Sequence, residues 1–244
     1  MSQNSTHQNA ELKLMTLIEP QNCGYLNGEK SNSVFIDTET PPTWQQYSNL
    51  SRLGFRRSGN HYYRPHCPYC NACIPCRVNV SQFDWRRRFK RILSRNSDLQ
   101  ATFVKPVNDE EHYQLYERYI STRHADGEMY PPSQDQYRDF IARDTGFSWF
   151  LDIRHGDELI ACSLVDVVDD GLSAIYTFFA PEAAERGLGI YAVLQQIIKA
   201  KQQQLPYVYL GYWIKNHKKM GYKSIYQPLE LFLKEEWSPF EQWL

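Results

Sequence analysis

The hydrophobic positions between residues 174 and 210 follow first a strand pattern and then a helical one. Residues 174–179 form a short run rich in aromatic and β-branched side chains, and Pro181 ends it. Apolar side chains then recur at the spacing of one helix face, at Ile190, Val193, Leu194, Ile197 and Ile198. A tyrosine-rich run at 207–210 closes the segment. The pattern predicts a strand-helix-strand unit around which the chain is organised.

More strands are expected immediately before this unit. Turn sequences at 155–157 (His-Gly-Asp) and 169–171 (Asp-Asp-Gly) divide this part of the chain into segments of strand length. Glycines at 187 and 189 introduce the helix, and glycines at such a junction let a ligand approach outward-pointing N–H groups. We therefore expect a mixed α/β (α+β) fold. Its order, antiparallel strands, a glycine-led helix and a further strand, resembles the acyltransferase core of the GNAT class.

Polarity and periodicity divide the chain into three parts. Residues 1–10 are polar and without periodicity, and we expect them to be disordered. Residues 11–105 contain most of the cysteines and a basic helical segment, and are expected to form an N-terminal lobe. Within this lobe, Thr43 follows two prolines and is expected to cap a helix. Residues 106–244 are expected to form the GNAT-like domain.

The overall composition limits the kinds of partner. The chain has 27 basic and 28 acidic side chains and a formal net charge of -1. A uniform positive surface is therefore absent, so nucleic-acid binding would have to come from local patches. No apolar run approaches the roughly 20 residues of a membrane span, and the N-terminal region carries no secretory signal. We expect a cytoplasmic protein with neither a membrane nor DNA as partner.

Four of the six cysteines fall within the run CPYCNACIPC at 67–76. In a reducing compartment, thiolates two residues apart are typical of a metal site, and either tetrahedral zinc or an iron-sulfur cluster suits them. Free thiols in a turn-rich loop are the alternative. Because such runs often send one ligand elsewhere, Cys23 is the natural remote partner. Cys162 lies in an apolar strand and is expected to be a small buried side chain.

Two basic clusters stand out in this nearly neutral chain. Residues 83–96 combine basic side chains with an apolar stripe at helical spacing, and a second cluster follows the tyrosine-rich strand. A solvated surface is the simple alternative, but we expect both clusters to bind the phosphate backbone of a nucleic acid. The expected contacts are Arg86, Arg87, Arg88, Lys90, Arg91, Lys215, Lys218, Lys219 and Lys223.

Several short motifs occur in one order along the chain. They are CGY at 23–25, GFRRSG at 54–59, YRPHCPYCNAC at 63–73, the basic segment 86–96, residues 119–126, LGIY at 188–191, LGYWI at 210–214 and KMGYK at 219–223. From about residue 19 this order resembles the aminoacyl-tRNA:protein transferase family, and within it the bacterial aspartate/glutamate leucyltransferases, whose eukaryotic relatives are arginyltransferases. The eukaryotic pattern has cysteine where this chain has Leu26 and Ile74. The resemblance therefore favours Cys23, Cys67, Cys70 and Cys73 as metal ligands, with Cys76 as a substitute.

The resemblance implies transfer of leucine from leucyl-tRNA to the N-terminal amine of proteins that begin with Asp or Glu, which creates an N-degron. An aminoacyl ester is already activated, so the chemistry requires no cofactor, and the amine must be positioned and lose a proton. Asp166 is the candidate base or amine anchor. Tyr176, Tyr191 and the amide of Gly189 are candidate donors to the oxyanion. Each of these side chains could instead serve only to pack the fold.

The implied substrates require two further kinds of contact. An acidic acceptor side chain calls for basic partners, and the candidates are Arg56, Arg57 and Arg123, with His124 nearby. The leucine side chain calls for an apolar pocket, for which Phe178, Phe179 and Trp213 are candidates.

Three other functions remain open from the sequence. The donor could be arginyl-tRNA with the same acceptors. A CoA-dependent N-acetyltransferase would need a fuller pyrophosphate-binding turn than residues 185–189 supply. A non-catalytic zinc module that binds nucleic acid would leave the C-terminal half unexplained.

Overall fold

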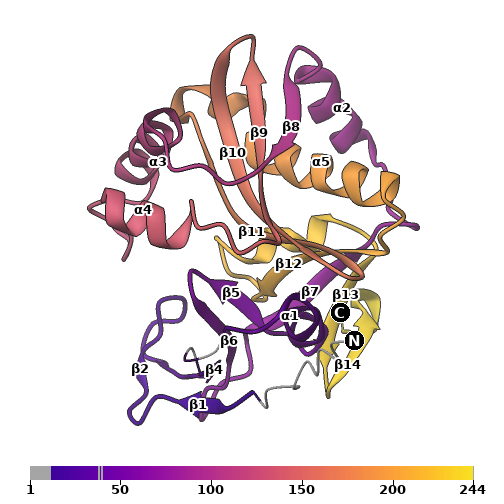
Figure 1. The fold of residues 1–244 in the computed structure, drawn as a ribbon. Coiled ribbons are helices and arrows are strands. Elements are labelled where there is room, and N and C mark those ends of the chain that lie inside the picture. The colour runs from indigo at the N-terminus through magenta and orange to yellow at the C-terminus, as the bar shows by residue number, and fades with distance from the viewer. Residues whose placement is uncertain (1–11, 38, 40, 244) are drawn as a thin grey trace, which may run out of the picture.

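The computed structural model describes residues 12–37, 39 and 41–243, and it has a large central sheet with helices packed against it (Figure 1). From one edge to the other the sheet contains β14 (Glu236–Pro239), β13 (Leu229–Leu233), β7 (Ile74–Asn79), β12 (Tyr207–Trp213), β11 (Gly171–Phe179), β10 (Glu158–Val168), β9 (Ser148–His155) and β8 (Gln100–Val104). The expected mixed α+β class is confirmed. The segment 1–10, expected to be disordered, lies outside the described residues.

Helices flank the large sheet: in Figure 1, α3 and α4 lie to its left, and α2 and α5 lie to its right. The α-helices are α1 (Trp44–Arg52), α2 (Arg87–Arg95), α3 (Glu110–Arg123), α4 (Gln134–Phe140) and α5 (Leu188–Gln202), and the 3₁₀ helices are η1 (Pro181–Arg186), η2 (Gly221–Ile225) and η3 (Phe240–Trp243). None of the described helices has both the length and the apolar character that crossing a membrane requires.

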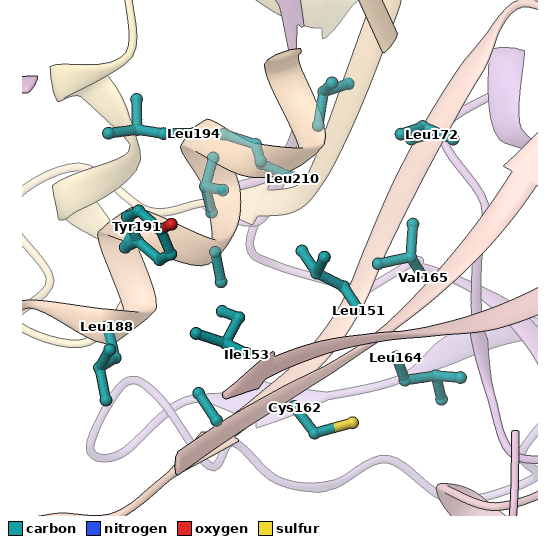
Figure 2. Packing of buried hydrophobic residues seen from close by; sticks show 14 of the residues in the cluster. Leu151, Ile153, Cys162, Leu164, Val165, Leu172, Leu188, Tyr191, Leu194 and Leu210 are labelled. Atoms are coloured by element: carbon teal, nitrogen blue, oxygen red, sulfur yellow. The ribbon is translucent and has the colours of Figure 1, made fainter. Parts of the chain in front are cut away.

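The predicted strand-helix-strand unit is β11, α5 and β12. β11 and β12 pair in parallel, whereas β9, β10 and β11 are joined as antiparallel hairpins by the turns predicted at 155–157 and 169–171. A parallel pair requires a crossover, which α5 provides. Figure 2 shows Leu188 and Leu194 of α5 in the same buried cluster as Leu151 and Ile153 of β9. The apolar face of the helix therefore anchors the sheet core.

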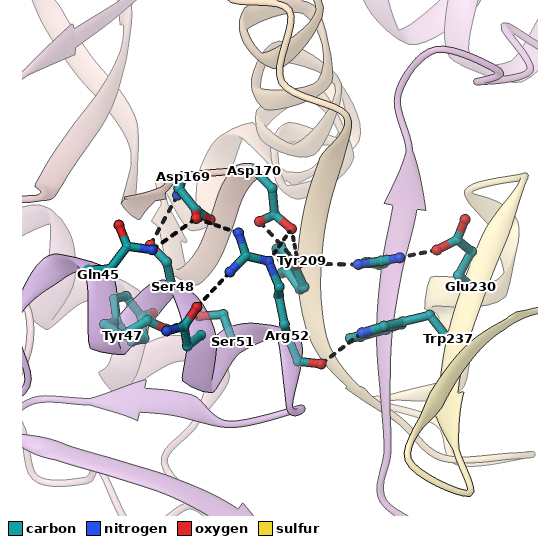
Figure 3. Close-up of polar contacts among 12 residues, drawn as sticks. Gln45, Tyr47, Ser48, Ser51, Arg52, Asp169, Asp170, Tyr209, Glu230 and Trp237 are labelled. Carbon is teal, nitrogen blue, oxygen red and sulfur yellow. Dashed lines mark hydrogen bonds and ion pairs between the residues drawn. The ribbon is translucent and has the colours of Figure 1, made fainter. Parts of the chain in front are cut away.

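A smaller sheet forms the N-terminal lobe. Its strands run in the order β1 (Leu14–Thr16), β4 (Ser33–Ile36), β6 (His61–Pro65) and β5 (Arg56–Ser58), and a two-stranded ribbon pairs β2 (Gln21–Asn22) with β3 (Lys30–Ser31). Thr43 caps α1 as predicted, in a capping box with Gln46. Arg52 of α1 pairs with Asp169 and Asp170 in the turn between β10 and β11 (Figure 3). These ion pairs fasten the lobe to the large sheet.

The boundary expected at residue 105 does not separate the two sheets. β7 and β8 precede that residue, yet both belong to the large sheet. β7 pairs with β12 on one side and β13 on the other, both from the C-terminal part of the chain. The expected boundary fails because pairing between distant strands leaves no local mark on the sequence.

Candidate functional site

An aromatic cluster lies where β11, α3 and the loop after α3 meet. Its members are Tyr119, His124, Tyr176 and Phe179. The Tyr119 ring centre lies 4.9 Å from that of Phe179 and 6.5 Å from that of Tyr176, and its hydroxyl is 3.3 Å from His124 Nε2. Arg123, one helical turn after Tyr119, places its guanidinium 5.3 Å from the Phe179 ring centre. The structure thus brings together the predicted site residues Arg123, His124 and Tyr176.

The environment of the aromatic cluster keeps the His124 and Tyr176 rings uncharged, and the exposed guanidinium of Arg123 lies beside them. Burial lowers the pKa of His124, and the charges of Lys219 and Arg123 lower it further, so the ring is neutral near pH 7. Burial raises the pKa of Tyr176 well above its ordinary value. A neutral imidazole can accept a hydrogen bond, a phenol can donate one, and the exposed Arg123 can bind an anion.

The first turn of α5 borders the same cluster. Gly187 adopts a left-handed conformation with φ of 69°, which lets the chain turn from η1 into α5. A Cβ atom on Gly189 would lie 3.8 Å from the Phe179 ring, so this turn lies against the aromatic cluster. Tyr191, in contrast, is only 4% exposed and packs in the core (Figure 2). It is not placed to donate a hydrogen bond to a substrate.

Asp166 and Arg57 form an ion pair whose two side chains have no exposed surface. Arg57 Nε and Nη2 donate to the two carboxylate oxygens at 2.7 and 2.8 Å. The hydroxyl groups of Tyr47 and Ser148 donate to the same oxygens at 2.9 and 2.8 Å. Burial alone would lower the pKa of Arg57, but the charge of Asp166 raises it above its usual value. This corrects the sequence-based expectation, because neither a base at Asp166 nor an anion site at Arg57 can be reached from solvent.

Arg56 lies on the opposite face of β5 and contacts β11. Its Nη1 donates to Ser173 Oγ at 2.8 Å. Gly211 has φ of 80°, and a Cβ atom there would lie 3.1 Å from Arg56 Nε, so both the backbone and the close guanidinium require glycine. Trp213 is largely buried, and its Nε1 donates to a carbonyl of η2 at 3.2 Å. Arg56 thus joins β5 to β11, and Trp213 joins β12 to η2; among the described residues, neither has a ring or guanidinium contact with the aromatic cluster.

Helix α2 presents its predicted basic face to solvent. The exposed side chains are Arg86, Arg87, Arg88, Lys90 and Arg91. Phe89 on the other face is fully buried and stacks on Tyr226, with the ring centres 5.6 Å apart and the planes within 1° of parallel. Tyr226 follows η2 directly. The helix of the first basic cluster therefore packs against the chain that follows the second cluster.

The second basic cluster surrounds a hollow of about 480 Å³ at the end of β12. The hollow is lined by Trp213, Lys215, Asn216, His217, Lys218, Gly221, Ser224 and Phe240. Lys215, Lys218 and Lys219 are exposed, but Lys223 is only 7% exposed and its Nζ donates to the Tyr212 carbonyl. Burial lowers the pKa of Lys223 to about 8. The expectation that Lys223 contacts nucleic acid is corrected, because a phosphate cannot reach its amino group.

The four cysteines favoured as metal ligands lie near one another. Burial raises the pKa of the Cys73 thiol to about 11, and Cys23, Cys67 and Cys70 raise it further through their charges. Two backbone N–H groups, of Tyr25 and Leu26, point at Cys23 Sγ at 3.4 Å each, as stabilisation of a thiolate requires.

Cys76, the substitute ligand, is instead buried in β7. Burial raises the pKa of its thiol, Lys223 and Arg56 lower it in part, and the resulting value is about 11. No other cysteine contributes to this shift.

Comparison with known proteins decides the family. Residues 21–91 match the family model for the N terminus of arginine-tRNA-protein transferase, and residues 111–233 match the model for its C terminus. The chain belongs to the arginine-tRNA-protein transferase family. It is 49% identical over 219 residues to the aspartate/glutamate leucyltransferase of Pseudomonas putida strain W619 and 50% identical to that of Pseudomonas fluorescens strain Pf0-1, covering 90% of this chain and 93% of each relative.

Among solved structures, L-PGS from Bacillus licheniformis aligns at a TM-score of 0.41 and 13% identity, over 59% of this chain and 48% of its own. Within the arginine-tRNA-protein transferase matches, the N-terminal one contains the cysteines and most of α2. The C-terminal one runs from α3 to β13 and contains the whole aromatic cluster.

The sequence pattern does not single out two tyrosines of this site, Tyr119 and Tyr222. Tyr119 contacts every other member of the aromatic cluster. The side chain of Tyr222 is 47% exposed, but its hydroxyl lies toward the protein: desolvation raises its pKa to about 12, and the charges of Cys76 and Tyr119 act in the same direction. Both tyrosines lie within the quoted motifs at 119–126 and 219–223, and that was the available signal.

Proposed function

We propose that this chain transfers leucine from leucyl-tRNA to the α-amino group of proteins that begin with Asp or Glu. The observation that carries the proposal is 49–50% identity to aspartate/glutamate leucyltransferases over 93% of their length. The transferred leucine becomes the new N-terminal residue of the acceptor, which is a degradation signal in the N-degron pathway. Because charged tRNA is made and used in the cytoplasm, we propose that the protein acts there.

The aromatic cluster and the start of α5 supply groups that this reaction requires. The acceptor amine attacks the ester carbonyl, a C–N bond forms, the C–O bond to the tRNA ribose breaks, and a proton from the amine ends on the ribose oxygen. In the proposal, the N–H groups around Gly189 and the Tyr176 hydroxyl donate to the developing oxyanion. The neutral His124 accepts a hydrogen bond from the amine and orients it. The half-buried ring of Phe179 offers apolar surface to the leucine side chain, whereas Phe178 is fully buried.

Arg123 is the proposed partner of the acidic acceptor side chain. It is exposed, it lies at the edge of the aromatic cluster, and among the described residues no acidic side chain pairs with it. A guanidinium in this position can bind a carboxylate through two hydrogen bonds. The side chain of an Asp or Glu acceptor would thereby hold its α-amine next to the cluster.

The exposed basic side chains of α2 and of the loop after β12 are the proposed contacts to tRNA. Their cations would displace counterions from the phosphate backbone. The stack of Phe89 on Tyr226 joins α2 to the end of η2, and η2 follows the loop that carries these lysines, which supports the proposal that both clusters act on one tRNA molecule. The hollow between Trp213 and Phe240 lies at the edge of this surface.

Cys23, Cys67, Cys70 and Cys73 are the proposed ligands of a structural zinc ion or iron-sulfur cluster. Their proximity and the two N–H groups aimed at Cys23 Sγ support this assignment. Thiolate ligands suit both metals. A metal there would hold the loops of the N-terminal lobe together and would supply no step of the transfer.

The test is a transfer assay with purified protein, radiolabelled leucyl-tRNA or arginyl-tRNA, and peptides that begin with Asp, Glu, Lys or Ala. We expect leucine on the Asp and Glu peptides alone. Arginine transfer would keep the reaction and change the donor. Absence of transfer from either tRNA would overturn the proposal.

A matched pair of variants tests the assignment of Arg123. Arg123→Ala should lower transfer to Asp and Glu peptides by at least tenfold, chiefly through KM for the peptide. Arg118→Ala is the control, because Arg118 lies on the same helix, has a side chain 51% exposed and lies 3.7 Å from Glu182. Equal losses in both variants would remove Arg123 from the acceptor site.

A further inference from the structure

Three rigid elements bring a histidine, a carboxylate and a cysteine together beneath α3. Asp152 of β9 and Cys162 of β10 are direct partners across the antiparallel pair, so their side chains lie on the same face of the sheet. His112 comes from the first turn of α3, which packs on that face. Their ligand atoms all lie within 4.8 Å of one another. In the described part of the chain, this trio has its ligand atoms within that distance of one another, whereas no three of the N-terminal cysteines do.

The imidazole of His112 is held in one orientation. Its Nδ1 lies 2.8 Å from Asp109 Oδ1, and Asp109 is also the N-cap of α3. Its Nε2 lies 3.1 Å from Asp152 Oδ1 and faces the cysteine side. A carboxylate on one ring nitrogen with the other nitrogen aimed at further donors is the arrangement found around metal-bound histidines.

The trio is also buried. His112 is 3% exposed, Asp152 6% and Cys162 0%. The nearest guanidinium, of Arg154, lies 3.9 Å from Asp152 and instead makes its close ion pair with Glu111 at 2.6 Å. The close partner of the Asp152 carboxylate is therefore the His112 ring at 3.1 Å, and a divalent cation bound between the two side chains would take the place of that contact.

We propose that His112, Asp152 and Cys162 bind a divalent cation of the zinc class. Nitrogen, oxygen and thiolate donors together favour Zn²⁺ over Mg²⁺ or Ca²⁺, which prefer oxygen alone. Two donors on one tetrahedral ion at about 2.0–2.3 Å are roughly 3.3–3.8 Å apart. The 3.1 Å between His112 Nε2 and Asp152 Oδ1 is already close to this value, and a separation at the 4.8 Å limit would have to shorten by about 1 Å. Three protein ligands leave one coordination position for water.

Such an ion would fix the N-terminal end of α3 to the sheet. The C-terminal end of the same helix carries Tyr119 and Arg123 of the candidate active site. The site is distinct from the four cysteines of the N-terminal lobe, and its test does not depend on transfer activity.

Cobalt titration of the full-length chain tests the proposal. A background in which Cys23, Cys67, Cys70 and Cys73 are all replaced by serine removes the N-terminal thiolates, so that a thiolate-to-cobalt absorption band reports on the buried trio. We expect one Co²⁺ per chain with the intensity of a single thiolate, and a higher Tm in the presence of Zn²⁺. The matched pair is Cys162→Ala, which should abolish the band, and Cys76→Ala, an equally buried cysteine whose loss should leave the band unchanged.

Two more variants guard against misfolding. His112→Gln retains hydrogen-bonding atoms and should also abolish the band, while Asp109→Asn should weaken cobalt binding by about 10–100-fold as a change in the orienting partner. X-ray absorption of the zinc-loaded background protein should show mixed nitrogen, oxygen and sulfur neighbours. Absence of saturable binding in the background protein, or a band that survives in both Cys162→Ala and His112→Gln, would show that hydrogen bonds alone hold the trio together.

Discussion

Replacing Asp166 by asparagine should reduce the stability of the fold. The substitution keeps the shape of the side chain and removes the charge that faces Arg57, which is fully buried and has no other acidic partner among the described residues. Removing one member of a buried ion pair costs about 3–5 kcal/mol, because the remaining charge is left without compensation. Four hydrogen-bond donors point at the Asp166 carboxylate in the unaltered protein. The asparagine amide can accept fewer of these hydrogen bonds, which lowers the stability further.

Urea unfolding followed by circular dichroism measures this loss. A loss of about 3–5 kcal/mol corresponds to a fall in Tm of roughly 6–20 °C for a chain of this size. Asp169→Asn is the control, since Asp169 also pairs with an arginine, but its side chain is 22% exposed and that of Arg52 is 38% exposed. An exposed pair contributes about 0–1 kcal/mol, so this variant should unfold close to the unaltered protein.

The transfer assay separates structural from chemical effects at Asp166. If the Asp166→Asn protein unfolds at the same urea concentration as the unaltered protein and yet loses transfer activity, the buried-pair explanation is wrong. In that case Asp166 would have to reach the substrate in a conformation that differs from the one described.

Three further predictions follow from single features. Replacing Arg87, Arg88 and Arg91, which are exposed on α2, by alanine should weaken tRNA binding. In filter-binding measurements, the slope of log affinity against log salt concentration should become less steep by about two to three. An unchanged slope would show that tRNA binds elsewhere. Burial lowers the pKa of Lys223 from 10.5 to about 8, so the unfolded chain binds more protons between these pH values and stability should rise with pH there. Lys223→Met should remove that rise, and parallel denaturation profiles of the two proteins at pH 8 to 10 would contradict it. A Cβ atom at Gly171 would lie 2.5 Å from the Tyr207 carbonyl oxygen, so Gly171→Ala should cost about 1–3 kcal/mol in urea unfolding, and an unchanged midpoint would show that β11 and β12 can separate freely.

Local patterns in the sequence predict the elements of this fold well. The helical spacing of apolar residues predicts α5, the Asp-Asp-Gly turn predicts the hairpin of β10 and β11, and Thr43 predicts the start of α1. Each of these signals depends on residues that are close along the chain. Arg123 and His124 of the aromatic cluster were proposed for a different reason, because an acidic acceptor calls for basic partners.

Contacts between distant residues account for the predictions that failed. Arg57 and Asp166 are 109 positions apart, so nothing near either residue indicates that the two neutralise each other. Lys223 belongs to a basic run but is buried against Tyr212, and only the packing of η2 on β12 decides that. Cys76 matches the spacing of the other cysteines, yet β7 begins at Ile74 and takes Cys76 into the core.

The position of β7 between β12 and β13 has a consequence for synthesis of the chain. β7 ends at Asn79 and β12 begins at Tyr207, so about 130 residues must follow before its first partner exists. At translation rates of about 5–20 residues per second, this interval lasts roughly 6–25 s. During that time β7 is a nascent strand with both edges unpaired, which makes it a binding site for chaperones and the segment most exposed to aggregation. Slowing translation after residue 79 should therefore lower the yield of native protein, even though the finished enzyme would be identical.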